Sequence, residues 1–205
     1  MIGAIAMLAA MIDPADRLAV DDVDAALVAR HRAGDPDAFA LIYRAHVDAV
    51  HRRLGRILGP IPDREDLTQD VFLALHKALP GFRGEAKLAT LLHRIAINRA
   101  CEHLRVQARR PATPMDTAFF DALVDGAGSP ERRAAEREAL TRVFECLARI
   151  KPKKRVAFVL RVVDGLSFEE IAELVDATPE AVAKRVQHAQ SELDELLARG
   201  ERRPS

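Results

Sequence analysis

The sequence predicts an all-α protein with two small helical domains joined by a flexible linker. Apolar residues recur at helical spacing through most of the chain, and no segment alternates with the period of two that marks a half-buried strand. Residues 111–130 hold three prolines, two glycines and three aspartates without a basic residue, as is typical of a linker. We therefore expect domains at 24–110 and 131–198 that move independently, flanked by tails at 1–23 and 199–205.

Four helices are predicted in the first domain from caps and breakers. Their expected limits are Asp24 to Gly34, Asp35 to Gly59, Asp63 to Pro80 and Glu85 to Ala108. The last three helices carry the apolar stripes Phe39, Ile42, Tyr43, Val50, Leu54 and Ile57; Leu67, Val71, Leu75 and Leu79; and Leu88, Leu91, Leu92, Ile95 and Leu104. These stripes predict a helical bundle with a Leu/Val/Ile core, since the chain has no tryptophan and only 4% aromatic residues.

The second domain is predicted to end in a helix-turn-helix. Two helices come first, one from about Glu131 and one from Pro152 to Val163. Ser167 with Glu170 three residues later then forms a capping box at the start of a third helix. The remaining signals are Asp176, which tolerates the left-handed turn conformation, Thr178 as the next cap and Pro179 in the first turn of the last helix. The buried stripe of the last helix is expected at Val182, Val186, Ala189, Leu193 and Leu196.

Charge is unevenly distributed, although the chain has 31 basic and 31 acidic residues. Residues 81–110 contain seven Lys/Arg against two acids, so one local face is basic. A basic face on a helix is typical of phosphate contacts, and a solvated helix surface is the alternative explanation.

At this point a resemblance is evident in several motifs. The segments are Asp66 to Phe72, Phe82 to Ala86, Arg94 to Asn98 and the helix-turn-helix at 165–193. In this order they resemble the extracytoplasmic-function group of bacterial RNA polymerase sigma factors, over roughly residues 24–197. The resemblance implies binding to core RNA polymerase, to promoter DNA and to an anti-sigma factor.

The resemblance also implies three sets of site residues. The first set is expected to bind core polymerase and consists of Asp66, Leu67, Gln69, Asp70 and Leu73. These residues form an acidic and apolar patch that would face a basic helix of the partner. The set expected to recognise and melt the minus-ten element is Phe82, Arg83, Lys87, Arg94, Asn98, Arg99 and Arg105. The set expected to read the minus-thirty-five element is Thr178, Glu180, Lys184, Arg185, Gln187 and His188.

The chain departs from the resembled family in its melting segment. Leu88, Leu91 and His93 occupy positions where relatives usually carry aromatic rings, which can stack on a melted base. Replacement of core aromatics would be simple repacking, whereas loss of stacking rings would weaken promoter opening. Two alternatives to a sigma factor therefore stay open: a helix-turn-helix regulator that does not melt DNA, and an interaction protein that titrates polymerase or an anti-sigma factor.

No catalytic constellation, cofactor motif or metal-ligand spacing is evident, so we expect a protein that acts by binding and is not an enzyme. Cys101 and Cys146 form no disulfide framework and fit a reducing cytoplasm. The apolar residues 1–12 are too short to span a bilayer and lack the basic start of a secretory signal. We expect them to be a disordered tail or the product of a mis-assigned start codon, with an interfacial helix as the third alternative and no insertion into a membrane.

Overall fold

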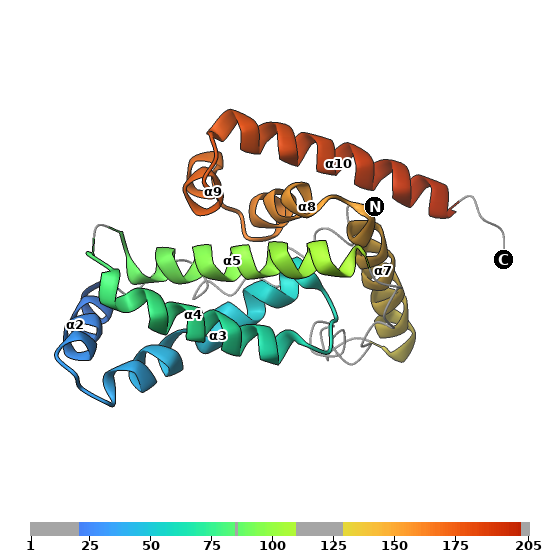
Figure 1. Ribbon diagram of the computed structural model, residues 1–205. Helices are drawn as coiled ribbons and strands as arrows, with labels where there is room; N and C mark the ends of the chain where they lie inside the picture. The colour runs from blue at the N-terminus through green and yellow to red at the C-terminus, as the bar shows by residue number, and fades with distance from the viewer. Residues whose placement is uncertain (1–20, 85, 110–128, 202–205) are drawn as a thin grey trace.

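The computed structural model describes residues 21–84, 86–109 and 129–201, and its regular elements within these ranges are all helices (Figure 1). The first domain contains α2 (Asp21–Arg32), α3 (Ala38–Leu58), α4 (Arg64–Ala78), a 3-10 turn (Leu79–Gly81) and α5 (Leu88–Gln107). The second contains α7 (Pro130–Arg149), α8 (Pro152–Phe158), a π-helical turn (Val159–Val163), α9 (Phe168–Val175) and α10 (Pro179–Glu201). The all-α prediction is confirmed. Residues 1–20 of the tail predicted at 1–23 and residues 111–128 of the linker predicted at 111–130 lie outside the described residues. The described ends of these segments are already part of the fold, since residues 21–23 belong to α2 and Ser129 and Pro130 begin α7.

The first helix differs from its prediction, because Asp24 does not cap it. α2 already begins at Asp21, and Asp24 lies inside it with a buried side chain. The Asp24 carboxylate lies 2.9 Å from Nε2 of His46 on α3, and both side chains are buried. The predicted cap at Asp24 is therefore wrong, because this side chain is satisfied by a partner 22 residues away.

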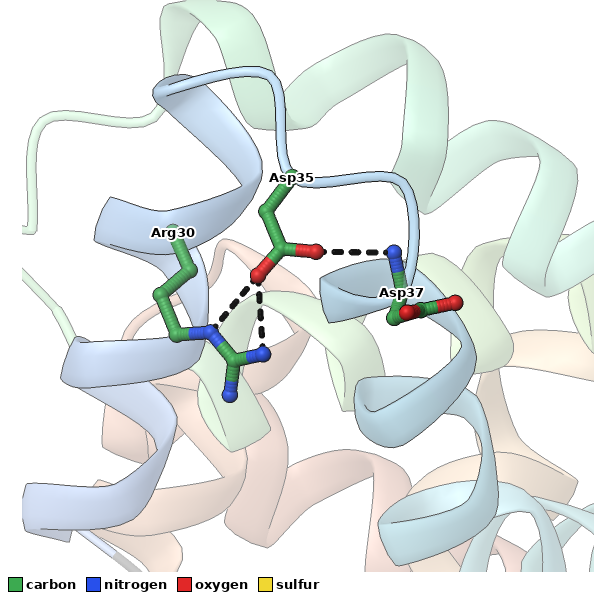
Figure 2. A network of polar contacts seen from close by, with 3 residues as sticks. All are labelled: Arg30, Asp35 and Asp37. Atoms are coloured by element: carbon green, nitrogen blue, oxygen red, sulfur yellow. Dashed lines mark hydrogen bonds and ion pairs between the residues drawn. The ribbon is translucent and has the colours of Figure 1, made fainter.

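The turn between α2 and α3 is held by Asp35 (Figure 2). Its carboxylate accepts from Nε of Arg30 at 2.8 Å and from the backbone N–H of Asp37 at 2.9 Å. The hydrogen bond from Asp37 and the one from Arg30 lower the pKa of the Asp35 carboxyl, so it stays ionised. The predicted start of the long helix at Asp35 is thus too early: Asp35 organises the turn, and α3 begins at Ala38.

α5 is the central helix of the molecule. It packs against α3 and α4 on one side and against α8 and α9 on the other (Figure 1). Leu92, Ala96 and Ala100 on α5 are fully buried, while Leu91 and Ile95, also predicted to be buried, are only half-buried. The helix begins at Leu88, three residues after the predicted start at Glu85.

The two domains pack directly against each other in this structure, while their independent movement in solution stays a prediction. The buried apolar residues form one cluster that runs through both domains. At the end of α3, a Cβ added to Gly59 would lie 2.5 Å from the ring of Phe144 on α7, so only glycine allows this approach. The buried Arg155 of α8 donates from Nε to the carbonyl oxygen of Ile57 at 2.7 Å. The sequence did not reveal this interface because its contacts join residues about 85 or more positions apart.

Candidate nucleic-acid and protein interfaces

The helix-turn-helix forms with the predicted local chemistry. Oγ of Ser167 accepts from the backbone N–H of Glu170 at 3.1 Å, and the Glu170 carboxylate accepts from the backbone N–H of Ser167 at 2.7 Å. Asp176 ends α9 in the left-handed region with φ 49°, and Oγ1 of Thr178 accepts from the backbone N–H of Ala181 at 3.2 Å. The capping box, turn and second cap are all confirmed, because each depends on neighbouring residues only.

α10 presents the predicted reading residues on its outward face. Val182, Ala189 and Leu193 are fully buried against the rest of the domain, whereas Val186 and Leu196 are half-buried. The predicted minus-thirty-five residues on the other faces are exposed, except for Arg185, which is half-buried: Thr178, Glu180, Lys184, Arg185, Gln187 and His188. This arrangement leaves the first two turns of α10 free to enter a major groove.

Glu180 already has partners in its own helix. Its backbone N–H, the Thr178 side chain and, to a smaller extent, the positive charge of Lys184 lower the pKa of its carboxyl. A carboxylate in the first turn of a helix is favoured by the helix dipole. The carboxylate therefore contributes to the start of α10, and the other two residues predicted to read bases on this face, Lys184 and Gln187, are both exposed.

The predicted minus-ten residues on α5 divide between two faces. Arg94, Asn98 and Arg105 are exposed and lie within about 40° of each other at 100° per residue, so they share one side of the helix. Arg99 lies on another side, where its Nη1 donates to the Glu102 carboxylate at 3.1 Å. The structure therefore groups one amide and two guanidinium groups into a single exposed strip and places Arg99 outside it.

The loop before α5 carries the remaining minus-ten residues. Arg83 and Lys87 are exposed, and Gly84 between them has φ 79°, a conformation that side-chain-bearing residues rarely adopt. Phe82 is half-buried and packs against the core, so only part of its ring is open to a ligand. Two cations and part of one ring thus precede the exposed strip of α5.

Two of the three positions at which the predicted melting segment lacks the usual aromatic residue belong to the core. Leu88 is 3% exposed and His93 is 4% exposed, whereas Leu91 is half-buried. Burial lowers the pKa of His93 well below its ordinary value, and the positive charges of Arg53 and Arg56 add to this effect. A buried leucine and a neutral buried imidazole are packing residues, so their presence removes no stacking surface from the exterior.

The predicted polymerase-binding residues form one exposed face on α4. Asp66, Gln69, Asp70 and Leu73 are all exposed, and Leu73 is 59% exposed although it is apolar. Leu67 is half-buried against the core. We call the four exposed residues the α4 patch. An exposed leucine beside two carboxylates and an amide is the composition of a surface that binds a basic, partly apolar partner.

A groove of about 400 Å³ lies on the surface where α4 and α5 meet, and it was not expected from the sequence. Leu67 and Asp70 line it from α4, while Arg99, Glu102 and Val106 line it from α5. The groove connects the α4 patch with Arg99, the residue outside the exposed strip. Its carboxylates and its exposed Val106 continue the acidic and apolar character of the α4 patch.

A buried charge cluster where the two domains meet was also not expected from the sequence. Arg53 and Arg56 of α3 both contact the carboxylate of Asp164, which lies between α8 and α9. The sequence does contain a signal for this cluster, namely two arginines inside an apolar helical stripe. A guanidinium group that is buried there requires an acidic partner.

Other site classes find no support in the described residues. Within 21–84, 86–109 and 129–201, no three His, Cys, Asp or Glu side chains come together in a way that could hold a metal ion. Nor does any helix in the part of the chain that the structure describes combine the length and apolarity needed to cross a bilayer.

The described residues define a class: a two-domain helical protein with a helix-turn-helix, an exposed basic strip on α5 and an exposed acidic and apolar patch on α4. Residues 42–110 match the sigma-70 region 2 family, and residues 140–193 match the sigma-70, region 4 family. The RNA polymerase sigma-H factor of Pseudomonas aeruginosa is 32% identical over 180 residues, covering 85% of this chain and 93% of that protein. The ECF RNA polymerase sigma-E factor of Escherichia coli K12 is 32% identical over 177 residues, covering 83% of this chain and 92% of that protein.

Two solved structures share the fold. CnrH in complex with the cytosolic domain of CnrY aligns with a TM-score of 0.58 at 23% identity, covering 86% of this chain and 98% of that chain. The sigma factor RpoE in complex with the anti-sigma factor NepR from Bartonella quintana aligns with a TM-score of 0.57 at 19% identity, covering 79% of this chain and 98% of that chain. The chain belongs to the sigma-70 family, and within it to the extracytoplasmic-function sigma factors.

Proposed function

We propose that this sigma factor binds core RNA polymerase through the α4 patch and reads promoters with two separate modules. The observation that carries the proposal is the separation of two kinds of exposed reading surface on two domains. The first module is the strip of Arg94, Asn98 and Arg105 on α5, and the second is the outward face of α10. Each surface is confined to a helix whose opposite side is buried.

The chemistry of each surface fits a different form of DNA. A helix end such as that of α10 enters the major groove of a duplex, where Gln187 can pair with adenine and Lys184 with guanine. An amide flanked by guanidinium groups, as at Asn98, can hydrogen-bond a splayed base while the cations hold phosphates. The chain itself performs no chemistry in this scheme, since the polymerase forms the phosphodiester bonds, and it acts in the cytoplasm.

We test the division of labour with two variants of the chain bound to core enzyme. Replacing Lys184 and Gln187 with Ala should weaken binding to duplex DNA that carries the upstream element, by ~1–3 kcal/mol for each base that the variant no longer reads. The same variant should bind a single-stranded minus-ten oligonucleotide as the wild type does. Asn98→Ala should have the opposite pattern, with impaired single-strand capture and open-complex formation and normal upstream duplex binding.

The outcomes separate the proposal from its rivals. Equal damage to both assays by either variant would contradict two separate readers. Run-off transcription by the reconstituted holoenzyme distinguishes a sigma factor from a DNA binder that cannot open promoters and from a protein that only titrates polymerase. Burial of Leu88 and His93 favours the sigma factor, since an aromatic ring at either buried position would pack in the core and would not be exposed for stacking on a base.

We also propose an anti-sigma factor as a regulator of this chain. The RpoE structure is a complex with the anti-sigma factor NepR, and the CnrH structure is a complex with the cytosolic domain of CnrY. The α4 patch, with its exposed Leu73, offers such a partner a surface that core polymerase would otherwise use.

A further inference from the structure

A buried ion cluster joins the two domains. Nε of Arg53 lies 3.0 Å from Oδ2 of Asp164, and Nε of Arg56 donates to Oδ1 at 2.6 Å. The side chains of all three residues are 2% exposed. The two arginines are three positions apart on α3 and therefore project from the same side of the helix. One carboxylate from the second domain thus bridges two guanidinium groups from the first.

Local structure in the second domain directs Asp164 into this position. The backbone N–H of Asp164 donates to the carbonyl oxygen of Val159 at 3.0 Å, which is the i to i−5 bond of a π-helical turn. Gly165 follows with φ 69° and turns the chain away toward α9. The extra residue of the π turn therefore ends the helix with the carboxylate facing α3.

Two further contacts make this a defined interface. Arg155 donates to the carbonyl oxygen of Ile57, one residue after Arg56, and Gly59 lies against the ring of Phe144. Burial lowers the pKa of Arg155 to about 10, so it is still charged at neutral pH. All of these contacts involve the last two turns of α3 and the residues just after it, and they add to the packing of α8 and α9 on α5.

The closed arrangement places the two reading modules close together. α8 and α9 pack on α5 (Figure 1). The same helix carries the exposed strip of Arg94, Asn98 and Arg105. Burial raises the pKa of the Cys101 thiol on α5, and the positive charges of Arg105, Lys153 and Arg185 partly oppose that rise. Lys153 and Arg185, from α8 and α10, therefore lie near the C-terminal half of α5.

In this closed arrangement the two domains cannot bind both promoter elements at the same time. Elements centred ten and thirty-five base pairs upstream of the start lie ~85 Å apart at 3.4 Å per base pair. Helices that pack on each other have axes only about 8–10 Å apart. Simultaneous reading of both elements requires the second domain to leave α5.

We propose that the Arg53–Arg56–Asp164 cluster is an autoinhibitory latch, which keeps the free sigma factor closed and must open when core polymerase takes up the two domains. The latch rests on the proposed function in one respect, namely that the two domains read separate promoter elements. Its ion pairs suit a reversible contact. Burying charges costs hydration free energy that offsets much of their attraction, and the same charges regain their hydration on opening.

The test uses Asp164→Asn in the full chain, which keeps the size of the side chain and removes its charge. Small-angle X-ray scattering should show a larger radius of gyration for the free variant than for the wild type. Its apparent affinity for core enzyme should rise several-fold, because the closed state reduces apparent affinity by the fraction of open molecules. The control is Glu138→Gln, which removes an exposed ion pair with Arg142 in the second domain and should change neither quantity.

A second variant guards against misfolding. Arg56→Gln should also expand the free chain, and the double variant should expand it no further, since both changes break one contact. Helix content from circular dichroism confirms that each variant is folded. If neither variant is larger than the wild type, or if both are larger but bind core enzyme no more tightly, the latch is refuted. If the wild type itself fails to bind core enzyme, the proposed function falls, and the scattering result still decides whether the cluster holds the domains together.

Discussion

His93 is the residue whose protonation the fold most clearly opposes. Its side chain is 4% exposed in the middle of α5, and burial together with the charges of Arg53, His46 and Arg56 keeps its pKa well below the ordinary value. The unfolded chain takes up this proton near pH 6.5, whereas the folded chain does not. Stability is therefore fully present above pH 6.5 and falls as the pH drops below it.

We expect His93→Gln to reduce this loss of stability in acid. For one proton the slope reaches about 1.4 kcal/mol per pH unit, so between pH 7.5 and 5.5 the wild type should lose ~1 kcal/mol more than the variant. Urea denaturation at the two pH values measures the difference. His51 also has a lowered pKa, mainly through burial, and should leave the variant some dependence on pH. Exposed His188 is the control, and a His188→Gln chain should keep the wild-type slope.

Asp70 is the residue at which the α4 patch meets the groove beside α5. We expect Asp70→Lys to weaken binding of core enzyme by ~1–3 kcal/mol, because it reverses a charge that would face a basic partner. Pull-down and titration with core enzyme measure the loss. Asp48→Lys places the same change on an exposed position of α3 and should bind normally. Wild-type binding by Asp70→Lys would refute the assignment of the α4 patch.

The short helix α9 depends on its capping box. It has only eight residues, which is too few for a stable helix without help from its ends or from packing. Ser167 and Glu170 supply two hydrogen bonds at its start, of 3.1 Å and 2.7 Å. The orientation of α9 fixes the entry to the turn and so the direction of α10, so the cap also supports the face that we propose to read DNA.

We expect Ser167→Ala to destabilise the second domain by about 1 kcal/mol, the usual cost of losing a helix cap. Chemical denaturation followed by circular dichroism measures the change. Ser191→Ala makes the same substitution at an exposed position within α10 and should have little effect or stabilise slightly, since Ala favours helix interiors. Equal stability of the two variants would mean that packing of Ile171 and Leu174 alone holds α9.

The whole molecule behaves as one packed unit in its closed form. Its buried apolar residues form a single cluster across both domains, and the Arg53–Arg56–Asp164 cluster connects them. We expect the wild type to unfold in one calorimetric transition. Asp164→Asn removes the carboxylate that pairs with the two arginines, so the domains should separate and the unfolding should divide into two transitions. Two transitions already in the wild type would contradict this coupling.

Features that depend on neighbouring residues could be predicted from the sequence alone. The helical class, the capping box of Ser167, the left-handed turn at Asp176 and the outward face of α10 all follow from spacing, and all are present. Hydrophobic periodicity and capping are local, so the order of residues determines them. The resemblance to sigma factors rests on such local motifs, and it is confirmed by the matches to region 2 and region 4.

Only the tertiary structure decided the role of residues whose partners are far away in the chain. Asp24 was expected to cap a helix, yet it pairs with His46, and Asp164 joins two arginines 108 or more positions before it. The groove beside α4 likewise depends on how helices pack. A buried charge has a low free energy only beside its partner, and packing brings such partners together in ways that spacing does not encode.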